Sequence, residues 1–300
     1  MVCYHPQQAF YTGERTSTGK MALTFNRAKG YSDKEIKLAC GRCIGCRLEY
    51  SKQWAIRCVH EAQLHEDNQF ITLTYNDRHL PRDYGLHYEH FQAFMKRLRK
   101  ELGNGIRFYM CGEYGDETSR PHYHALLFNC DLPDRRLHTI RRGNRHYTSE
   151  TLTRLWGKGH CYTSDVTWQS AAYCARYVTK KITGQGADDH YRWVDKTSGE
   201  IHDRAPEFGK MSLRPGIGTQ WLEKFKTDVY PCDFVVMNGR KYKPPKAYDK
   251  WLEKHDPELL KRLKIQRVRK GKALCENSTP DRLRVREAVQ LDSYTRLRRE

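Results

Sequence analysis

The segment Arg107–Asn129, RFYMCGEYGDETSRPHYHALLFN, decides the fold of the chain. It predicts two antiparallel strands joined by a polar turn over Gly115–Pro121, because apolar and aromatic residues fill both ends and turn-forming residues the middle. Side chains alternate between the faces of a strand, so His122 and His124 share one face. Glu113 ends the first strand and is expected beside His122. Two imidazoles and one carboxylate leave open positions on a divalent ion, so this hairpin predicts a metal site that performs chemistry.

A second segment favours this metal site over a plainer interpretation, in which the two histidines are only half-buried polar residues of a strand. In Ser170–Lys181, SAAYCARYVTKK, the spacing predicts a helix with Tyr173, Tyr177 and Lys180 on one face. The alternative is that both tyrosines are core aromatics and Lys180 extends past them. A phenol beside a fixed cation is a primed nucleophile. Together with the metal hairpin, it predicts phosphoryl transfer through a covalent tyrosine intermediate.

The composition indicates the partner. Lys and Arg number 54 and Asp and Glu 36, so the formal net charge is +18, and such an excess is typical of proteins that bind a polyanion. No stretch approaches the ~20 apolar residues of a membrane span. The N-terminus, MVCYHPQQ, lacks the pattern of a signal peptide. We therefore expect a nucleic acid as the partner, no membrane, and a location in the host bacterial cytoplasm.

The cysteines predict a second, structural metal site. The chain has 11 of them, an odd number without any sign of export, which argues against disulfides. Residues 40–46 contain a C-x2-C-x2-C run, whose spacing suits a tetrahedral zinc ion. The remaining alternatives are buried free thiols and an iron–sulfur cluster. The expected zinc ligands are Cys3, Cys40, Cys43 and Cys46, with His5 or Cys58 as replacements for Cys3.

The order of expected elements predicts an α+β fold, a mostly antiparallel sheet with helices packed on it. Helices are expected at Leu48–Glu66 and His87–Leu102, near residues 151–155, and from Thr167–Ser170 to Gly184; strands are expected at Phe70–Asp77 and Gly159–Thr167. Residues 1–38 are expected to be irregular, with short strands near Lys20–Asn26, and residues 131–146 to be a basic loop. We expect an N-terminal arm (1–66), a catalytic core (67–185) and a basic, mainly helical C-terminal region (186–300) that need not fold independently.

The basic C-terminal region contains 13 Lys and Arg against 4 Asp and Glu over residues 240–272. A charge run is usually a solvated surface. On top of the net charge of the whole chain, it predicts contact with phosphates.

Three motifs resemble those of the HUH endonucleases, the proteins that initiate rolling-circle replication. Phe70–Asp77 (FITLTYND) resembles their first motif, and PHYHALLF, which begins at Pro121, resembles the His–hydrophobic–His motif. YCARYVTK, which begins at Tyr173, resembles the two-tyrosine motif of the initiators of microvirid single-stranded DNA phages. With the cysteine run, the chain is most similar to the gokushovirus branch. The resemblance is specific over Phe70–Lys181, looser over the cysteines and vague after Gly184.

The resemblance implies a HUH-like sheet that holds Mn²⁺ or Mg²⁺ on His122, His124 and a third ligand, which we assign to Glu113 with Asp116 and Glu117 as alternatives. It implies nicking and joining of single-stranded DNA at a replication origin through a 5′-phosphotyrosine, with Tyr173 and Tyr177 as nucleophiles and Lys180 steadying the phosphate. A host helicase and polymerase are expected as partners. Two alternatives stay open: a non-catalytic, zinc-containing single-strand binder, and a related HUH transposase or relaxase. Many relatives lack the cysteine run, so the zinc prediction rests on spacing alone.

Overall fold

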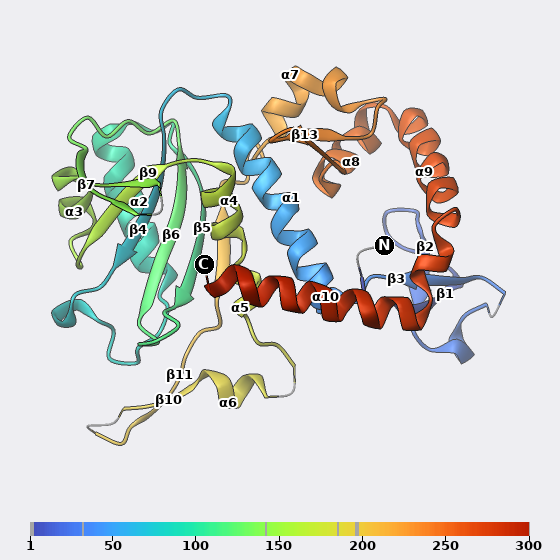
Figure 1. Ribbon diagram of the computed structural model, residues 1–300, viewed down its shortest axis with the longest axis horizontal. Helices are drawn as coiled ribbons and strands as arrows, with labels where there is room; N and C mark the ends of the chain where they lie inside the picture. The colour runs from blue at the N-terminus through green and yellow to red at the C-terminus, as the bar shows by residue number, and fades with distance from the viewer. Residues whose placement is uncertain (1–2, 32, 142, 185, 196–197, 300) are drawn as a thin grey trace. The chain divides into compact units, whose positions relative to one another are not determined.

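The chain forms two compact units in the computed structural model (Figure 1), one from residues 1–50 and 261–300 and the other from residues 51–260. The structure describes every residue except 1–2, 32, 142, 185, 196–197 and 300. Helix α1 (Ile44–Ala62) begins in the first unit and continues in the second. The expected division at residues 66 and 185 stays a prediction about independently folding domains.

The first unit contains a small sheet and a long C-terminal helix. Strands β1 (Gln7–Arg15), β2 (Met21–Thr24) and β3 (Glu35–Leu38) form an antiparallel sheet in the order β2-β1-β3. The expectation of an irregular arm was therefore wrong, although a short strand was expected where β2 lies. Polar residues on both faces of these strands gave no alternating pattern to find. The other elements are η1 (Arg27–Lys29), the end of α9 (Pro257–Lys272), η3 (Cys275–Ser278) and α10 (Pro280–Arg299).

The second unit is built on a seven-stranded sheet in the order β12-β5-β6-β4-β9-β8-β7. Each paired neighbour in it is antiparallel, which confirms the predicted α+β class with an antiparallel, HUH-like sheet. Its central strands are rich in apolar and aromatic residues, which suit a sheet covered on both faces. The strands are β4 (Asn68–Thr74), β5 (Arg107–Tyr114), β6 (Pro121–Phe128), β7 (Arg136–Arg141), β8 (Asn144–Thr148), β9 (Cys161–Asp165) and β12 (Phe208–Met211).

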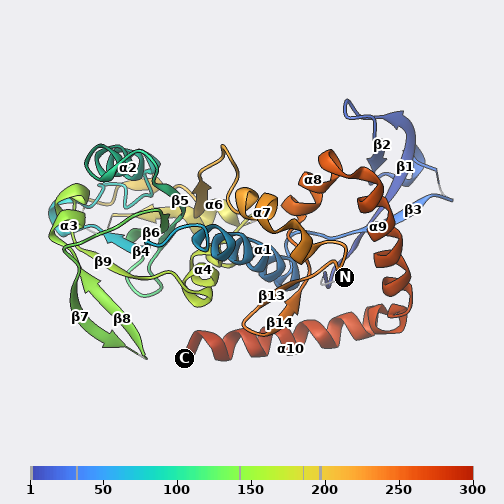
Figure 2. The same cartoon turned by 90° about the horizontal axis from the view of Figure 1, so that it is seen from above.

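Two sets of helices cover the two faces of this sheet, as Figure 2 shows for α2 and α4. Helix α2 (Tyr88–Leu102) buries Phe91, Phe94, Met95 and Leu98 against one face, and Gly103 ends it as expected, with its N–H bonded to the carbonyl of Arg99. α3 (Glu150–Trp156) packs on the same face. The other face packs against α1 and α4 (Trp168–Ala175) through Ala55, Cys58, Ala171 and Cys174. We call these the α2 face and the α4 face.

Two expectations for the second unit were wrong. The basic loop expected at residues 131–146 is largely a hairpin, β7 and β8, because residues 136–148 alternate well enough to pair. The expected continuous tyrosine helix is instead α4 followed by the single turn α5 (Tyr177–Lys180), with Arg176 between them.

The remaining elements follow the expected pattern of short pieces after residue 184. They are η2 (Asp77–His79) and α6 (Ala187–Tyr191), the hairpin β10 (Arg192–Val194) and β11 (Ile201–Asp203), α7 (Thr219–Val229), the hairpin β13 (Val235–Met237) and β14 (Arg240–Tyr242), and α8 (Lys246–His255). Among the described residues, no helix combines the length and the apolar character that crossing a membrane requires.

Candidate functional site

The register of the central strands brings the expected metal ligands together on the α4 face. Glu113 on β5 lies directly opposite His122 on β6, and Cys111 lies opposite His124. On the other side of β6, His124 is paired with Thr72 of β4. Paired residues point to the same face, so Glu113, His122 and His124 converge. One ligand atom from each lies within 4.8 Å of the others, which makes this group a possible metal site.

Hydrogen bonds on the far side of each imidazole fix its orientation. Nδ1 of His122 lies 3.1 Å from the carbonyl oxygen of Arg120, and Nδ1 of His124 lies 2.9 Å from Oγ1 of Thr72. These contacts leave both Nε2 atoms facing Oε1 of Glu113, at 3.2 Å from His122 and 3.4 Å from His124. Partners of this kind commonly orient metal-binding histidines.

The chemistry of this group calls for a cation. Nδ1 of His122 faces a carbonyl, which only accepts, so Nδ1 bears the proton and a neutral ring points the Nε2 lone pair at the Glu113 carboxylate. Two acceptors face each other unless a proton or a metal ion lies between them. Nε2 of His124 is buried and has no hydrogen-bond partner among the described residues. The donor set therefore fits a divalent cation, with borderline nitrogen and hard oxygen ligands.

The ionisation of the group follows from burial and neighbours. Burial alone would raise the pKa of Glu113, but the two imidazoles that face it outweigh burial and hold this pKa far below its usual range. Burial lowers the pKa of His124 and so favours its neutral form. A carboxylate and a neutral imidazole are the forms that bind metal ions.

Tyr173 and Lys180 lie beside this group. The Tyr173 hydroxyl donates to Oε1 of Glu113 at 3.5 Å, and its ring packs edge-on against His124 with the centroids 5.0 Å apart. Tyr173 is 42% exposed, so its hydroxyl can meet a substrate. Nζ of Lys180 lies 3.3 Å from Glu113 and 3.3 Å from Asp116. Burial and then the Glu113 charge raise the pKa of Tyr173, so it is a phenol here.

Tyr177 occupies a different environment from Tyr173. It is 8% exposed and belongs to the core on the α4 face. Its ring lies against Gly209 of the edge strand β12, where an added Cβ would come within 2.6 Å of the Tyr177 hydroxyl oxygen. The expected continuous helix with both tyrosines alike on one exposed face was therefore wrong. The turn at Arg176 and the packing on Gly209 separate the two side chains in accessibility.

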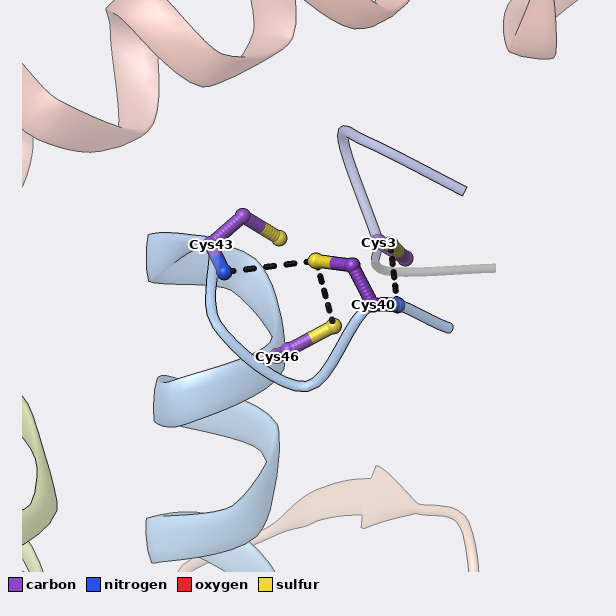
Figure 3. Close-up of side chains that lie close together, drawn as sticks. All are labelled: Cys3, Cys40, Cys43 and Cys46. Atoms are coloured by element: carbon purple, nitrogen blue, oxygen red, sulfur yellow. Dashed lines mark hydrogen bonds between the residues drawn. The ribbon is translucent and has the colours of Figure 1, made fainter. Parts of the chain in front are cut away.

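The four expected zinc ligands also lie together, in the first unit (Figure 3). One sulfur from each of Cys3, Cys40, Cys43 and Cys46 lies within 4.8 Å of the others, a second possible metal site. The sulfurs of Cys40 and Cys46 are 4.0 Å apart, near the spacing of about 3.8 Å that tetrahedral zinc thiolates require. The alternatives for the fourth ligand lie elsewhere: His5 contacts Glu287 at 2.7 Å, and Cys58 is part of the core of the second unit.

Backbone N–H groups surround the cysteine sulfurs, as expected for thiolates. The N–H of Tyr4 donates to Cys43 at 3.4 Å and that of Cys40 to Cys3 at 3.2 Å. Burial would raise the pKa of Cys40, but the N–H groups of Cys43 and Arg42 outweigh it and lower this pKa to about 7. Leu283 of α10 completes the packing around the group. The cluster fits a closed, structural zinc site better than a catalytic one, because all four positions are sulfur.

The comparison with known proteins gives the family. The family model for the phage replication-associated protein ORF2 and its relatives matches residues 68–182, a range that includes both the metal ligands and the tyrosine segment. The replication-associated protein VP4 of Bdellovibrio phage phiMH2K is 35% identical over 264 residues, which cover 82% of this chain and 79% of the relative. The chain belongs to the family of phage replication-associated proteins.

Two further relatives agree with this family. The replication-associated protein ORF2 of Spiroplasma virus 4 is 31% identical over 85% of this chain and 81% of its own. The replication-associated protein ORF4 of Chlamydia phage 1 is 29% identical over 82% of this chain and 62% of its own. These phages are microvirid-like, which confirms the recognition made from the motifs. No solved structure matches the chain.

Two members of the site were not predicted from the sequence. Thr72, which orients His124, lies within the segment already recognised as the first motif, and pairing of β4 with β6 would have placed it. The carbonyl of Arg120 belongs to the backbone, so no side-chain pattern points to it. Glu117, an alternative third ligand, is not part of the group, and Asp116 contacts it only through Lys180.

Proposed function

We propose that this protein is a metal-dependent single-stranded DNA endonuclease and strand transferase that initiates rolling-circle replication at a phage origin. The main support is the contact between the Tyr173 hydroxyl and Glu113, which places an accessible nucleophile against the two-histidine, one-carboxylate group. The relatives' printed names, replication-associated proteins of phages, support the biological setting.

His122, His124 and Glu113 would hold Mn²⁺ or Mg²⁺. When bound, such an ion would polarise the scissile phosphate and offset the charge on its oxygens, which contributes several kcal/mol. The residues around it have separate tasks. Thr72 and the Arg120 carbonyl hold the two rings in place.

In the cleavage step the Tyr173 oxygen forms a bond to phosphorus as the bond from phosphorus to the 3′ oxygen breaks. The products are a 5′-phosphotyrosine and a free 3′-OH, which a host polymerase can extend. Glu113 is the acceptor that faces the Tyr173 proton, and the departing 3′ oxygen gains a proton. The ammonium group of Lys180 stands 3.3 Å from Glu113, where its charge can steady the phosphate. One phosphoester replaces another, so the reaction needs no ATP.

The structure supports an order for the two tyrosines. Tyr173 is accessible and would attack first, whereas Tyr177 is covered and would act only after its packing on Gly209 opens. Tyr177 would then cut the regenerated junction, and the new 3′-OH would attack the phosphotyrosine at Tyr173. This second transfer releases a closed circle.

The test is covalent labelling. Wild-type protein is incubated with Mn²⁺ and a library of labelled single-stranded circular genomes, then run on a denaturing gel. We expect a protein-bound label that disappears with EDTA and with Tyr173→Phe. Tyr177→Phe should retain the first adduct but release no closed circles. Tight DNA binding without an adduct anywhere in the library would establish the alternative, a non-catalytic single-strand binder. Adducts in the double Tyr→Phe variant would overturn the tyrosine assignment.

The zinc ion at Cys3, Cys40, Cys43 and Cys46 is proposed as structural, because binding of a metal by four sulfurs contributes directly to folding. A transposase or relaxase using the same chemistry is a weaker candidate, since relaxases of this kind usually have the tyrosine near the N-terminus. The basic residues 240–272, the host helicase and polymerase, and the host cytoplasm complete the proposed setting.

A further inference from the structure

The hairpin β7–β8, which we call the arginine arm, is a basic element that the proposed chemistry does not use. Residues 135–149 include five arginines and no acidic residue. The arm lies at one edge of the seven-stranded sheet, farthest in strand order from β12. Figure 2 shows it extending away from the sheet on the side where α4 lies.

The pairing of the arm sorts its arginines between the two faces. Tyr147 is paired with Thr163 of β9, which is paired in turn with Ile71 in the core against α2. Tyr147 therefore lies on the α2 face, and the neighbouring positions 146 and 148 lie on the α4 face. Arg136 is paired with Thr148, so it shares the α4 face.

The tip of the arm follows the same rule. Arg141 is paired with Asn144, which is two residues from position 146 and so lies on the α4 face. Arg145, between these positions, lies on the opposite face with its partner Ile140. Both Arg141 and Arg145 are exposed, which makes Arg145 a matched control for Arg141.

A polar row connects the arm to the metal ligands across the α4 face. His124 contacts Thr72 at 2.9 Å, Thr72 is paired directly with Tyr162, and the ring of Tyr162 lies 5.5 Å from that of His138 on the arm. His124 and Tyr162 are two strand spacings apart, about 10 Å. Tyr162 is 38% exposed.

The opposite face has no such open row. The residues of the neighbouring positions, Ile71 and Thr163, are at most 1% exposed because the helices of the α2 face cover them. The row through Thr72 and Tyr162 is thus an uncovered strip of sheet that runs from the metal ligands to the arm.

A plainer explanation of the arginines is protection of an edge strand, where charges discourage pairing with other chains. It explains neither the exposed Leu137 and Ile140, at 55% and 57%, nor the contact with Tyr162. Arg136 has an ion pair with Glu150 at 3.6 Å, but both side chains are at least 80% exposed, so this pair is weak. Arg136 therefore remains available to a phosphate.

We propose that Tyr162 and the α4 face of the arginine arm hold the DNA strand that flanks the scissile phosphate. A base would stack on Tyr162, and Arg136 and Arg141 would each bind a backbone phosphate. Aromatic stacking combined with a positive groove is the general way in which proteins bind single strands. The proposal rests on the proposed function only in taking single-stranded DNA as the substrate.

The experiment measures binding and cleavage separately. Binding of a labelled, mixed-sequence single strand of about 20 nucleotides is followed by anisotropy in EDTA, over a series of salt concentrations. The variants are Arg136→Ala/Arg141→Ala, Tyr162→Ala and Tyr162→Phe. The controls are Arg145→Ala, on the other face of the same arm, and Lys96→Ala/Lys100→Ala, on the exposed side of α2. Adduct formation is assayed in parallel, and near-ultraviolet circular dichroism checks the fold.

We expect the double arginine variant to bind about tenfold or more weakly and to lose about 1.4 from the salt slope, about 0.7 for each phosphate contact. Replacing both arginines with Lys should restore most of the slope. Tyr162→Ala should bind about fivefold or more weakly, whereas Tyr162→Phe should bind like wild type because it keeps the ring. Both control variants should bind nearly normally.

The results separate this proposal from the proposed function. Normal binding by the arginine and Tyr162→Ala variants, in a protein that forms adducts, overturns the arm proposal alone. An equal loss in Arg145→Ala overturns the assignment to the α4 face. Weakened binding without any adduct in wild type supports the arm and overturns the nuclease.

Discussion

Glu113 and His122 face each other across the β5–β6 pair, with Oε1 of the carboxylate 3.2 Å from Nε2 of the imidazole. A slip of one residue in this register would send one of them to the opposite face. The hairpin pairing, rather than the turn that follows, therefore decides which acidic residue completes the group. This relationship can be tested residue by residue.

Glu113→Gln should remove most of the affinity for Mn²⁺, because an amide replaces the only carboxylate of the group among the described residues. We expect a loss of at least about 100-fold, beyond the 10–100-fold of an outer-shell change. Isothermal titration with Mn²⁺ measures it. Asp116→Asn is the control, since Asp116 is 61% exposed and contacts Lys180. A greater loss in Asp116→Asn would reassign the third ligand.

Thr72→Val keeps the shape of the side chain but removes the hydroxyl that contacts Nδ1 of His124. We expect about 10-fold weaker Mn²⁺ binding and slower adduct formation, with little change in stability, because the ring loses its orienting partner. Thr74→Val is matched in chemistry and strand, but the Thr74 hydroxyl donates to the His160 carbonyl instead of a ligand. Equal effects of the two changes would argue against an orienting role for Thr72.

The cysteine group predicts a pattern of thiol reactivity. Cys232 and Cys275 are exposed and should react with a thiol reagent in the native protein. A strong chelator should release about one zinc per chain and make four further thiols reactive, because zinc-bound thiolates are protected. Elemental analysis of Cys40→Ser should show the loss of that zinc, while Cys275→Ser should retain it. Retention of zinc by Cys40→Ser would contradict the assignment.

His60 predicts a loss of stability in mild acid. Burial lowers the pKa of His60 to about 3, where it stacks on Trp221 and contacts the Tyr248 hydroxyl at 2.7 Å. Below pH 6.5 the unfolded chain takes up a proton that the folded chain refuses, so the free energy of unfolding should fall by about 1.4 kcal/mol per pH unit. From pH 6.5 to 5 the loss is about 2 kcal/mol.

Urea unfolding of wild type and His60→Gln at several pH values between about 5 and 7.5 measures this effect. The variant is less stable throughout because it loses the stacking, but its free energy of unfolding should depend less on pH. Parallel pH profiles for the two proteins would show that another group is responsible.

The sequence was informative where period and spacing act locally. Alternation over β5 and β6 was enough to place Glu113 beside His122, and the spacing of Phe91, Phe94, Met95 and Leu98 was enough to define α2. The short runs of residues 1–38 and 136–148 gave no comparable signal, because their strands are polar and half-exposed. They become ordered by pairing with neighbours, which a local pattern does not report.

The environment of Tyr177 depended on a distant partner in the same way. The four-residue spacing from Tyr173 was correct, but a turn at Arg176 and a glycine 32 residues further along decide which ring is covered. Likewise, Cys3 was a plausible fourth ligand among three, and only the course of the N-terminal segment selects it.

The contact between His5 and Glu287 joins positions separated by 282 residues, and Tyr4 and Leu283 pack around the same cysteines. During synthesis Cys3 and the residue 40–46 cysteines leave the ribosome early, yet the packing around them is complete only when α10 has been made. At about 5–20 residues per second, the interval is of the order of ten seconds or more. Early capture of a metal ion would protect these thiols over that time, whereas the second unit needs no residue beyond 260 to complete its own core.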